Sequence, residues 1–248
     1  MVVGVKRALD LVREGRIYDL GRVLDERAPV FPGRHFRQLL VPNAMPVGGL
    51  SWVADVVSTT TQVGTHLDAL CHLSEHGRIH GGHAVADVAE PSGFAVHGVE
   101  TAPQFVVAAW LVDVAPLGPG DVIGVPDIDP HPGDAVLFHT GWGRHWDDPD
   151  TYLSGQPGPG LELAEWLAAR DVALTGCDTW SYGPVPAEDP DRPFAVPQHL
   201  NVHHGVFIVE NLDTSELARD GVREFALILT HPKLRGATGA WTSPIALV

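Results

Sequence analysis

Cysteine and basic charge are both scarce in this 248-residue sequence. The only two cysteines, Cys71 and Cys177, lie far apart and without CxxC spacing, which argues against a disulfide framework. Sixteen Lys and Arg residues stand against 31 Asp and Glu residues, and the formal net charge of −15 disfavours nucleic acid or an anionic membrane as a partner. No stretch approaches the ~20 consecutive apolar residues of a membrane span, and no apolar signal core follows Met1. We therefore expect a cytoplasmic protein.

The hydrophobic pattern predicts more strands than helices. An amphipathic helix is expected over residues 5–15 and a strand over 17–20, followed by a long ordered loop over the Pro- and Gly-rich residues 29–50. A β-branched strand over 52–61 leads into the segment 62–72. Further strands are expected at 104–112, 135–139, 173–176, 206–209 and 225–229, and helices at 161–170 and 214–220. No repeat or linker divides the chain, so residues 1–248 are predicted to form one α/β domain with a mixed β-sheet or barrel-like core and peripheral helices.

The segment 62–72 carries a cluster of metal-ligating residue types. Histidine is abundant, with 14 residues in the chain. In an extended chain His66 and Asp68 project to the same face and could converge on one cation, with His72 nearby if the chain turns, and Gln62 could add its amide oxygen. Imidazole and carboxylate suit zinc, manganese or iron. The alternative, a hydrogen-bonded polar core, has about equal weight on the residues alone.

The same segment resembles the signature of the cyclase-like metal-dependent hydrolases, a family that includes bacterial kynurenine formamidase and isatin hydrolase. That signature reads His-x-Gly-Thr-His-x-Asp-x-x-x-His, and the chain matches five of its six fixed positions, with Gln62 in place of the first histidine. The resemblance implies a swivelling β/β/α fold and assembly as a homodimer or homotetramer. Blocks similar to the family also stand at residues 18–20, 132–137, 140–142, 176–181, 209–212 and 236–239.

The resemblance also implies roles for individual residues. His66 and Asp68 would bind metal, and His72 would be the general acid/base. Some relatives add a histidine and a glutamate, for which His199 and Glu210 are the candidates, although His199 is equally compatible with a hydrated loop. Because glutamine binds metal more weakly than imidazole, Gln62 favours one manganese or zinc ion over a two-zinc centre.

Three further residues are candidates for contact with a small-molecule substrate: Trp180, Trp52 and His76. The tryptophans could form an aromatic pocket wall, since ligand sites are mostly apolar with a few polar groups, although tryptophan is more often a core residue. The leading function is hydrolysis of an amide or ester bond in a small cyclic or N-acyl substrate, with water activated by the metal and His72 transferring the proton. A metal-dependent cyclase or dehydratase and a catalytically silent metal-binding scaffold are the alternatives.

Overall fold

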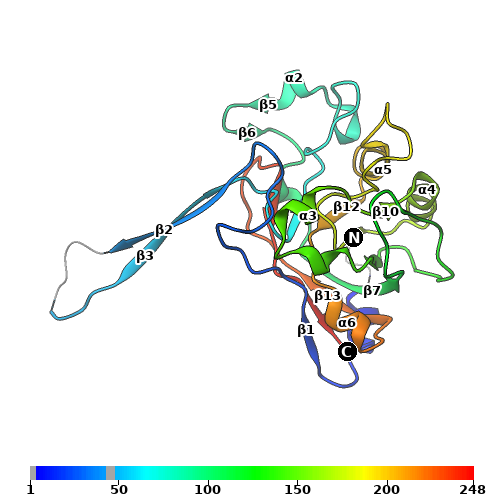
Figure 1. Cartoon of the computed structure of the whole chain (residues 1–248). Helices are drawn as coiled ribbons and strands as arrows, with labels where there is room; N and C mark the ends of the chain where they lie inside the picture. Colours follow the sequence, from blue (N-terminus) through cyan, green and yellow to red (C-terminus); the bar gives the residue numbers. More distant parts are fainter. Residues whose placement is uncertain (1–3, 43–47) are drawn as a thin grey trace.

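The structure, a computed structural model, describes residues 4–42 and 48–248, and its centre is one curled, mixed sheet of nine strands (Figure 1). Four neighbouring strands run parallel, namely β7 (Phe105–Asp113), β9 (Ala135–His139), β11 (Leu174–Cys177) and β12 (Phe207–Glu210), and the strands on either side of them pair antiparallel. The predicted α/β domain with a mixed, barrel-like sheet and few helices is confirmed. In spatial order the strands are β1 (Ile17–Asp19), β15 (Ile245–Leu247), β13 (Glu224–Leu229), β7 (Phe105–Asp113), β9 (Ala135–His139), β11 (Leu174–Cys177), β12 (Phe207–Glu210), β4 (His66–Asp68) and β14 (Gly239–Trp241).

The middle of the sheet is buried on both faces. In β9 successive side chains alternate between two cores, as strand geometry requires: Leu137 lies in one, while Val136 and Phe138 lie in the other. Helix α4 (Leu161–Ala169) covers the second face and contributes Leu163 and Leu167 to its core. A nearly continuous apolar strand is typical of a parallel sheet covered on both sides.

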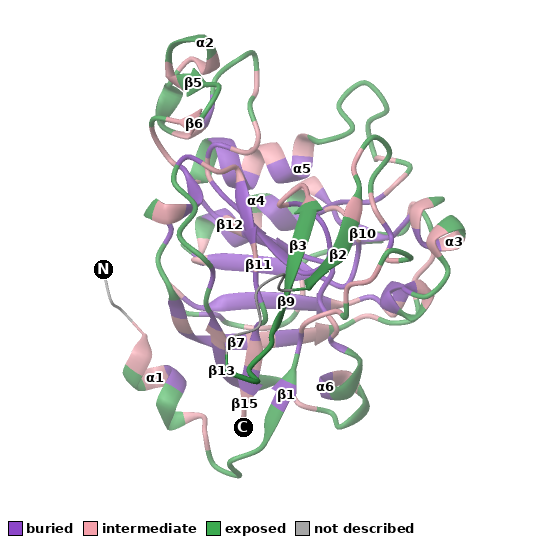
Figure 2. Cartoon of the chain, turned by 90° about the vertical axis from the view of Figure 1, so that its left-hand side faces the viewer, coloured by how far each residue is buried: buried purple, intermediate pink, exposed green. Residues whose placement is uncertain are grey.

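A two-stranded arm projects away from this body (Figure 1). Strand β2 (Phe36–Pro42) pairs antiparallel with β3 (Val53–Thr59), with Leu39 opposite Val56, and both strands are exposed along most of their length (Figure 2). The prediction of a loop over residues 29–50 is therefore wrong at residues 36–42, which form β2. Residues 43–47 of the predicted loop lie outside the described part of the chain. The strand predicted at 52–61 does form, but it belongs to the arm and not to the main sheet.

The remaining elements are short and surround the sheet. The helices predicted at 161–170 and 214–220 are present as α4 and α6, whereas the helix predicted at 5–15 ends at Asp10. In the described residues, no helix has the length and apolar character needed to cross a membrane. The other strands are β5 (Ala89–Glu90), β6 (Gly93–Phe94), β8 (Val122–Ile123) and β10 (Gly158–Pro159); the other helices are α1 (Val5–Asp10), α2 (Val85–Val88), α3 (Pro149–Leu153), α5 (Ala195–Pro197), α6 (Ser215–Arg219), three 3₁₀ helices at His80–Gly82, Val99–Thr101 and Trp142–His145, and a π-helix at Gln198–His204.

Candidate metal centre

Strand β4 places two of the predicted ligands beside a third from a distant part of the sequence. It lies between β12 and β14, and its pairing with β12 sets His66 directly opposite Glu210. The intervening Leu67 is fully buried in the hydrophobic core, on the other face of the strand. His66 and Asp68 therefore share a face, as the two-residue period of an extended chain predicts.

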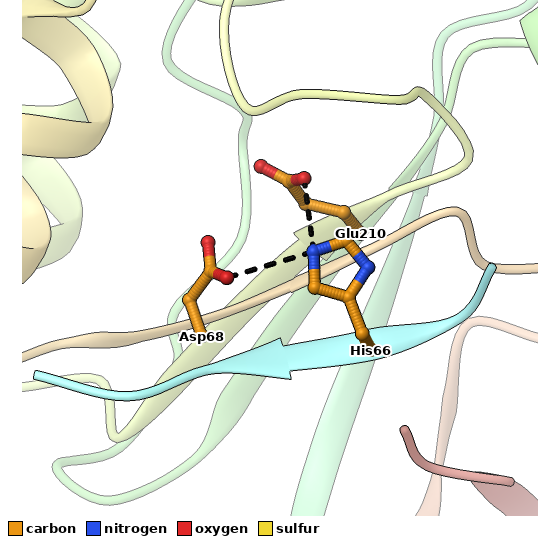
Figure 3. A group of neighbouring side chains, drawn as sticks. All are labelled: His66, Asp68 and Glu210. Atoms are coloured by element: carbon orange, nitrogen blue, oxygen red, sulfur yellow. Dashed lines mark ion pairs between the residues drawn. The ribbon is translucent and has the colours of Figure 1, made fainter. Parts of the chain in front are cut away.

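The three side chains converge closely enough to hold one ion (Figure 3). The Nε2 atom of His66 lies 3.5 Å from Oδ1 of Asp68 and 3.4 Å from Oε2 of Glu210. Ligands about 2.1 Å from a tetrahedral metal are separated from one another by about 3.4 Å. Within the described residues, this is the one group of three or more His, Cys, Asp or Glu side chains whose ligand atoms all lie within 4.8 Å of one another.

Two of these atoms are buried without a hydrogen-bond partner. Nδ1 of His66 faces the carbonyl oxygen of Gly64 at 2.8 Å and donates its hydrogen there, which leaves Nε2 with a free lone pair. Within the described residues, neither this Nε2 nor Oδ1 of Asp68 has a hydrogen-bond partner. Buried polar atoms without partners are costly, and a cation between them would remove that cost. The donor set therefore fits a divalent metal.

The electrostatics of the group lead to the same conclusion. Burial, and after it the neighbouring carboxylate of Glu210, together raise the pKa of Asp68 to about 8. Burial lowers the pKa of His66, but the carboxylates of Glu210 and Asp68 outweigh burial, so that this pKa is raised overall. Without a cation the group retains protons, and metal binding would displace them.

Asn211 holds the turn before β4 against the end of β12. Its side chain donates from Nδ2 to the carbonyl oxygen of Gly64 at 3.0 Å, and its own carbonyl accepts from the Thr65 hydroxyl at 2.7 Å. Tyr152 donates to Oδ1 of Asn211 at 2.9 Å. Both Gly64 and Asn211 have positive φ, a conformation that glycine and asparagine tolerate best. Asn211 lies in a block, 209–212, that resembles the family, but nothing in the local sequence indicates this role.

His72 lies at the edge of the group, in contact with Gln62. Its Nε2 is 3.8 Å from Oδ1 of Asp68, and its Nδ1 is 3.4 Å from the amide nitrogen of Gln62. The same amide contacts the hydroxyls of Thr61 and Thr238, each at 3.0 Å. Both polar atoms of Gln62 thus have hydrogen-bond partners, unlike Nε2 of His66 and Oδ1 of Asp68. Burial, followed by the charges of His66 and Arg34, lowers the pKa of His72 to about 3.

A cavity of about 340 Å³ opens onto these residues. Asp68, His72 and Glu210 contribute its polar wall, and Trp180, which sequence analysis had placed near the substrate, belongs to its apolar wall. Phe31 packs against Trp180 with ring centroids 5.6 Å apart. No role was predicted for six of the lining residues: Phe31, Arg34, Leu73, Ser181, Phe194 and Pro197. The Pro-Gly pair before Arg34 is typical of a turn, and it was the one local signal at that residue.

Three other predicted site residues lie outside this cavity. Trp52 is 54% exposed and lies just before β3, in the arm that leads away from the body. His76 is exposed on a loop with positive φ. His199 is in the π-helix, where its ring packs against those of His203 and His204, and it is not part of the group formed by His66, Asp68 and Glu210.

Residues 18–184 match a known family model that is described as "Putative cyclase". The chain belongs to the cyclase family. The matched range of this cyclase-family protein includes His66, Asp68 and His72, whereas Glu210 lies beyond it and joins the group through the pairing of β4 with β12. No curated protein matches the sequence.

Solved structures share the fold of this cyclase-family protein. A crystal structure of a novel cyclase is similar over 100% of this chain and 92% of its own, with 23% identity and a TM-score of 0.89. Isatin hydrolase A from Ralstonia solanacearum is similar over 94% of this chain and 92% of its own, with 23% identity and a TM-score of 0.70. A predicted metal-dependent hydrolase from Bacillus stearothermophilus is similar over 94% and 98%, with 20% identity and a TM-score of 0.66.

Proposed function

We propose that this protein is a metal-dependent hydrolase that cleaves an amide or ester bond in a small cyclic or N-acyl substrate. The observation that carries the proposal is the buried group His66, Asp68 and Glu210, in which two ligand atoms lack a hydrogen-bond partner among the described residues. Asp68 and Glu210 of this group line a cavity together with His72. The names of two structural neighbours, isatin hydrolase A and a metal-dependent hydrolase, support the same class of reaction.

The ligand set suits manganese or zinc, because it combines one imidazole with two carboxylates. A divalent ion bound there supplies Lewis acidity, which lowers the pKa of a water molecule and polarises a carbonyl group. The chain's own residues orient the reaction. The carbonyl of Gly64 fixes the tautomer of His66, and the apolar wall around Trp180 limits the access of bulk water to the substrate.

His72 is the residue that we assign to proton transfer. Its low pKa keeps the imidazole uncharged at neutral pH, so that it can first accept a proton from water and then return it to the leaving nitrogen or oxygen. In the structure the amide nitrogen of Gln62 faces Nδ1 of His72. For Nε2 of His72 to accept, Nδ1 must carry the hydrogen, and the amide must be turned over so that its oxygen faces Nδ1. The hydroxyls of Thr61 and Thr238 accommodate that orientation, since each can donate or accept. We therefore propose that Gln62 positions His72 and does not bind the metal.

The experiment that tests the function combines metal analysis with turnover. Purified wild-type protein is expected to contain close to one equivalent of manganese or zinc and to hydrolyse at least one member of a panel of N-acyl amides, cyclic imides and lactones. His72→Ala should retain the metal and lose at least a hundredfold in kcat, as expected for a general acid/base. His131→Ala, a change at an exposed histidine outside the cavity, is the matched control and should leave both unchanged.

The possible outcomes separate the candidate functions. Absence of stoichiometric metal would overturn the metal site. Metal without hydrolysis, but with ring closure or dehydration of a panel compound, would favour a cyclase or dehydratase. Metal without any turnover would favour a binding scaffold.

We also propose that the chain assembles as a homodimer or homotetramer through its arm. Leu39, Leu40, Val53 and Val56 are each more than half exposed, and an isolated two-stranded hairpin is at best marginally stable in water. Light scattering of the wild type should give a mass of two or four chains, and the double variant Leu39→Lys with Val56→Lys should give one. A wild type that remains monomeric at micromolar concentration would refute this assembly.

A further inference from the structure

Arg34 is a half-buried cationic side chain that lines the same cavity as Asp68, His72 and Glu210. In the described part of the chain it forms no ion pair, whereas Arg22, which is also largely buried, pairs with Asp213 at 3.2 Å. A guanidinium group that is partly withdrawn from water without a carboxylate partner has an unmet requirement for an anion.

Local structure fixes Arg34 in this position. Phe31 to Arg34 form a turn in which the Arg34 amide donates to the Phe31 carbonyl at 2.9 Å, and Gly33, at φ 86°, occupies the position that requires a positive φ. The guanidinium carbon of Arg34 lies 5.1 Å from the centre of the Phe31 ring, and Phe31 in turn packs on Trp180. This stacking reduces the side-chain freedom that a ligand would otherwise have to restrict.

Most of the hydrogen-bonding capacity of Arg34 remains unused by the protein. Nη1 donates to the backbone carbonyl of Gln62 at 2.9 Å. A guanidinium group has five N–H donors in a planar fork, and its geometry matches the two oxygens of a carboxylate. The single bond to Gln62 orients the group and leaves the other donors available to a ligand.

The charge balance of the cavity selects the sign of that ligand. Deprotonated Asp68 and Glu210 contribute two negative charges, which a divalent ion at the metal site would neutralise. Arg34 then carries the one uncompensated charge among the cavity-lining residues. We propose that Arg34 forms a subsite for a carboxylate group of the substrate, so that the substrate class is a small amide or ester with a free carboxylate and an apolar body. This inference rests on the proposed hydrolase function for its substrate, but its first test does not require turnover.

Equilibrium binding of phenylacetate and phenylacetamide provides the first test, because these two probes have the same apolar body and differ in charge. Wild-type metal-loaded protein should bind phenylacetate roughly tenfold or more tightly than phenylacetamide, the effect expected of charge-assisted hydrogen bonds. Arg34→Gln should abolish the preference, and Arg34→Lys should retain part of it, since lysine keeps the charge but not the fork. The metal content of each variant is measured as well, because phenylacetate could also bind directly to the ion. A preference that is lost while the metal content stays unchanged is then due to Arg34.

Arg27→Gln is the matched control, because Arg27 is 90% exposed and lies outside the cavity. It should leave the preference for phenylacetate unchanged. The subsite is refuted if the wild type binds both probes equally, or if Arg34→Gln keeps the full preference with unchanged metal content and a folded circular dichroism spectrum.

The second test uses two acyl amides, N-acetylphenylalanine and N-acetylphenethylamine, which differ by one carboxylate. Arg34→Gln should raise KM for the acid at least tenfold and should leave KM for the neutral amide unchanged. An equal loss of kcat on both amides would overturn the proposal, because it would place Arg34 at the developing oxyanion. If neither amide is hydrolysed but the preference for phenylacetate depends on Arg34, the subsite stands and the hydrolase proposal fails.

Discussion

In the metal-free protein, the free energy of unfolding should decrease as the pH rises. Asp68 is buried, with 2% of its surface exposed, and its pKa in the folded, metal-free protein is about 8, against an ordinary value of 3.8. Below pH 4 the carboxyl group is protonated in both the folded and the unfolded chain, so it contributes no difference. Between pH 4 and pH 8 the folded chain binds more protons than the unfolded chain, and the free energy of unfolding therefore decreases with pH.

The size of this effect follows from the shift. A rise of about four pKa units corresponds to about 6 kcal/mol at most, since each unit is worth about 1.4 kcal/mol. His66 changes stability in the same direction, because its pKa is also raised in the folded state and its contribution is lost as it deprotonates. A loss of this size is comparable to the whole stability of many domains.

Urea unfolding of the protein in EDTA, at pH 5 and pH 8, measures the effect directly. The free energy of unfolding should be several kcal/mol lower at pH 8, and addition of manganese or zinc should stabilise the protein more at pH 8 than at pH 5, because the metal competes with fewer protons. Asp68→Asn should remove most of the slope. The reasoning is refuted if the metal-free wild type is equally stable at both pH values, or if Asp68→Asn has the same slope.

Substitutions at four positions test other parts of the structure. Glu210→Gln should lower metal affinity at least tenfold, measured by competition with a chelating dye, whereas unchanged affinity would exclude Glu210 as a ligand. Gln62→Glu should keep kcat within a few-fold, because a carboxylate can accept from Nδ1 of His72. Gln62→Met should lower kcat about tenfold with metal content unchanged. Equal effects of the two substitutions on kcat would argue that Gln62 does not position His72. Asn211→Ala should cost about 2–4 kcal/mol in urea unfolding, since it leaves the Gly64 carbonyl and the Tyr152 hydroxyl with one partner fewer, and a cost below 1 kcal/mol would contradict this. Leu137→Ala, at a fully buried position of strand β9, should cost about 2–5 kcal/mol by creating a cavity, and a much smaller loss in the same assay would indicate that the sheet core is loosely packed.

Local pattern was sufficient to predict the part of the site that lies in one strand. His66 and Asp68 are two residues apart, and strand geometry alone places them on one face. Glu210 was reached only through resemblance, because no local pattern in the sequence indicates that β12 pairs with β4. Arg34 and Asn211 were missed since their roles depend on contacts with segments far away in the chain.

The fold was predicted well where burial leaves a clear pattern and poorly where it does not. Strand β9 is apolar on both faces and its bounds were predicted at 135–139, as observed. Strand β2 has apolar residues but no hydrophobic core beneath it, and its Pro- and Gly-rich surroundings are typical of a loop. Trp52 was misplaced for a similar reason. The direction of the arm decides what this residue contacts, and local periodicity does not encode that direction.

The contact between the turn before β4 and the end of β12 also determines when, during synthesis, the protein can acquire a metal ion. Thr65 and Asn211, which form a hydrogen bond in this contact, are 146 positions apart in the chain. During synthesis, a ribosome that has released His66 and Asp68 still has more than half of the polypeptide to make before Glu210 emerges. The metal site therefore cannot form on an early nascent chain, and any ion captured by the first two ligands alone remains weakly held and exchangeable until the sheet closes.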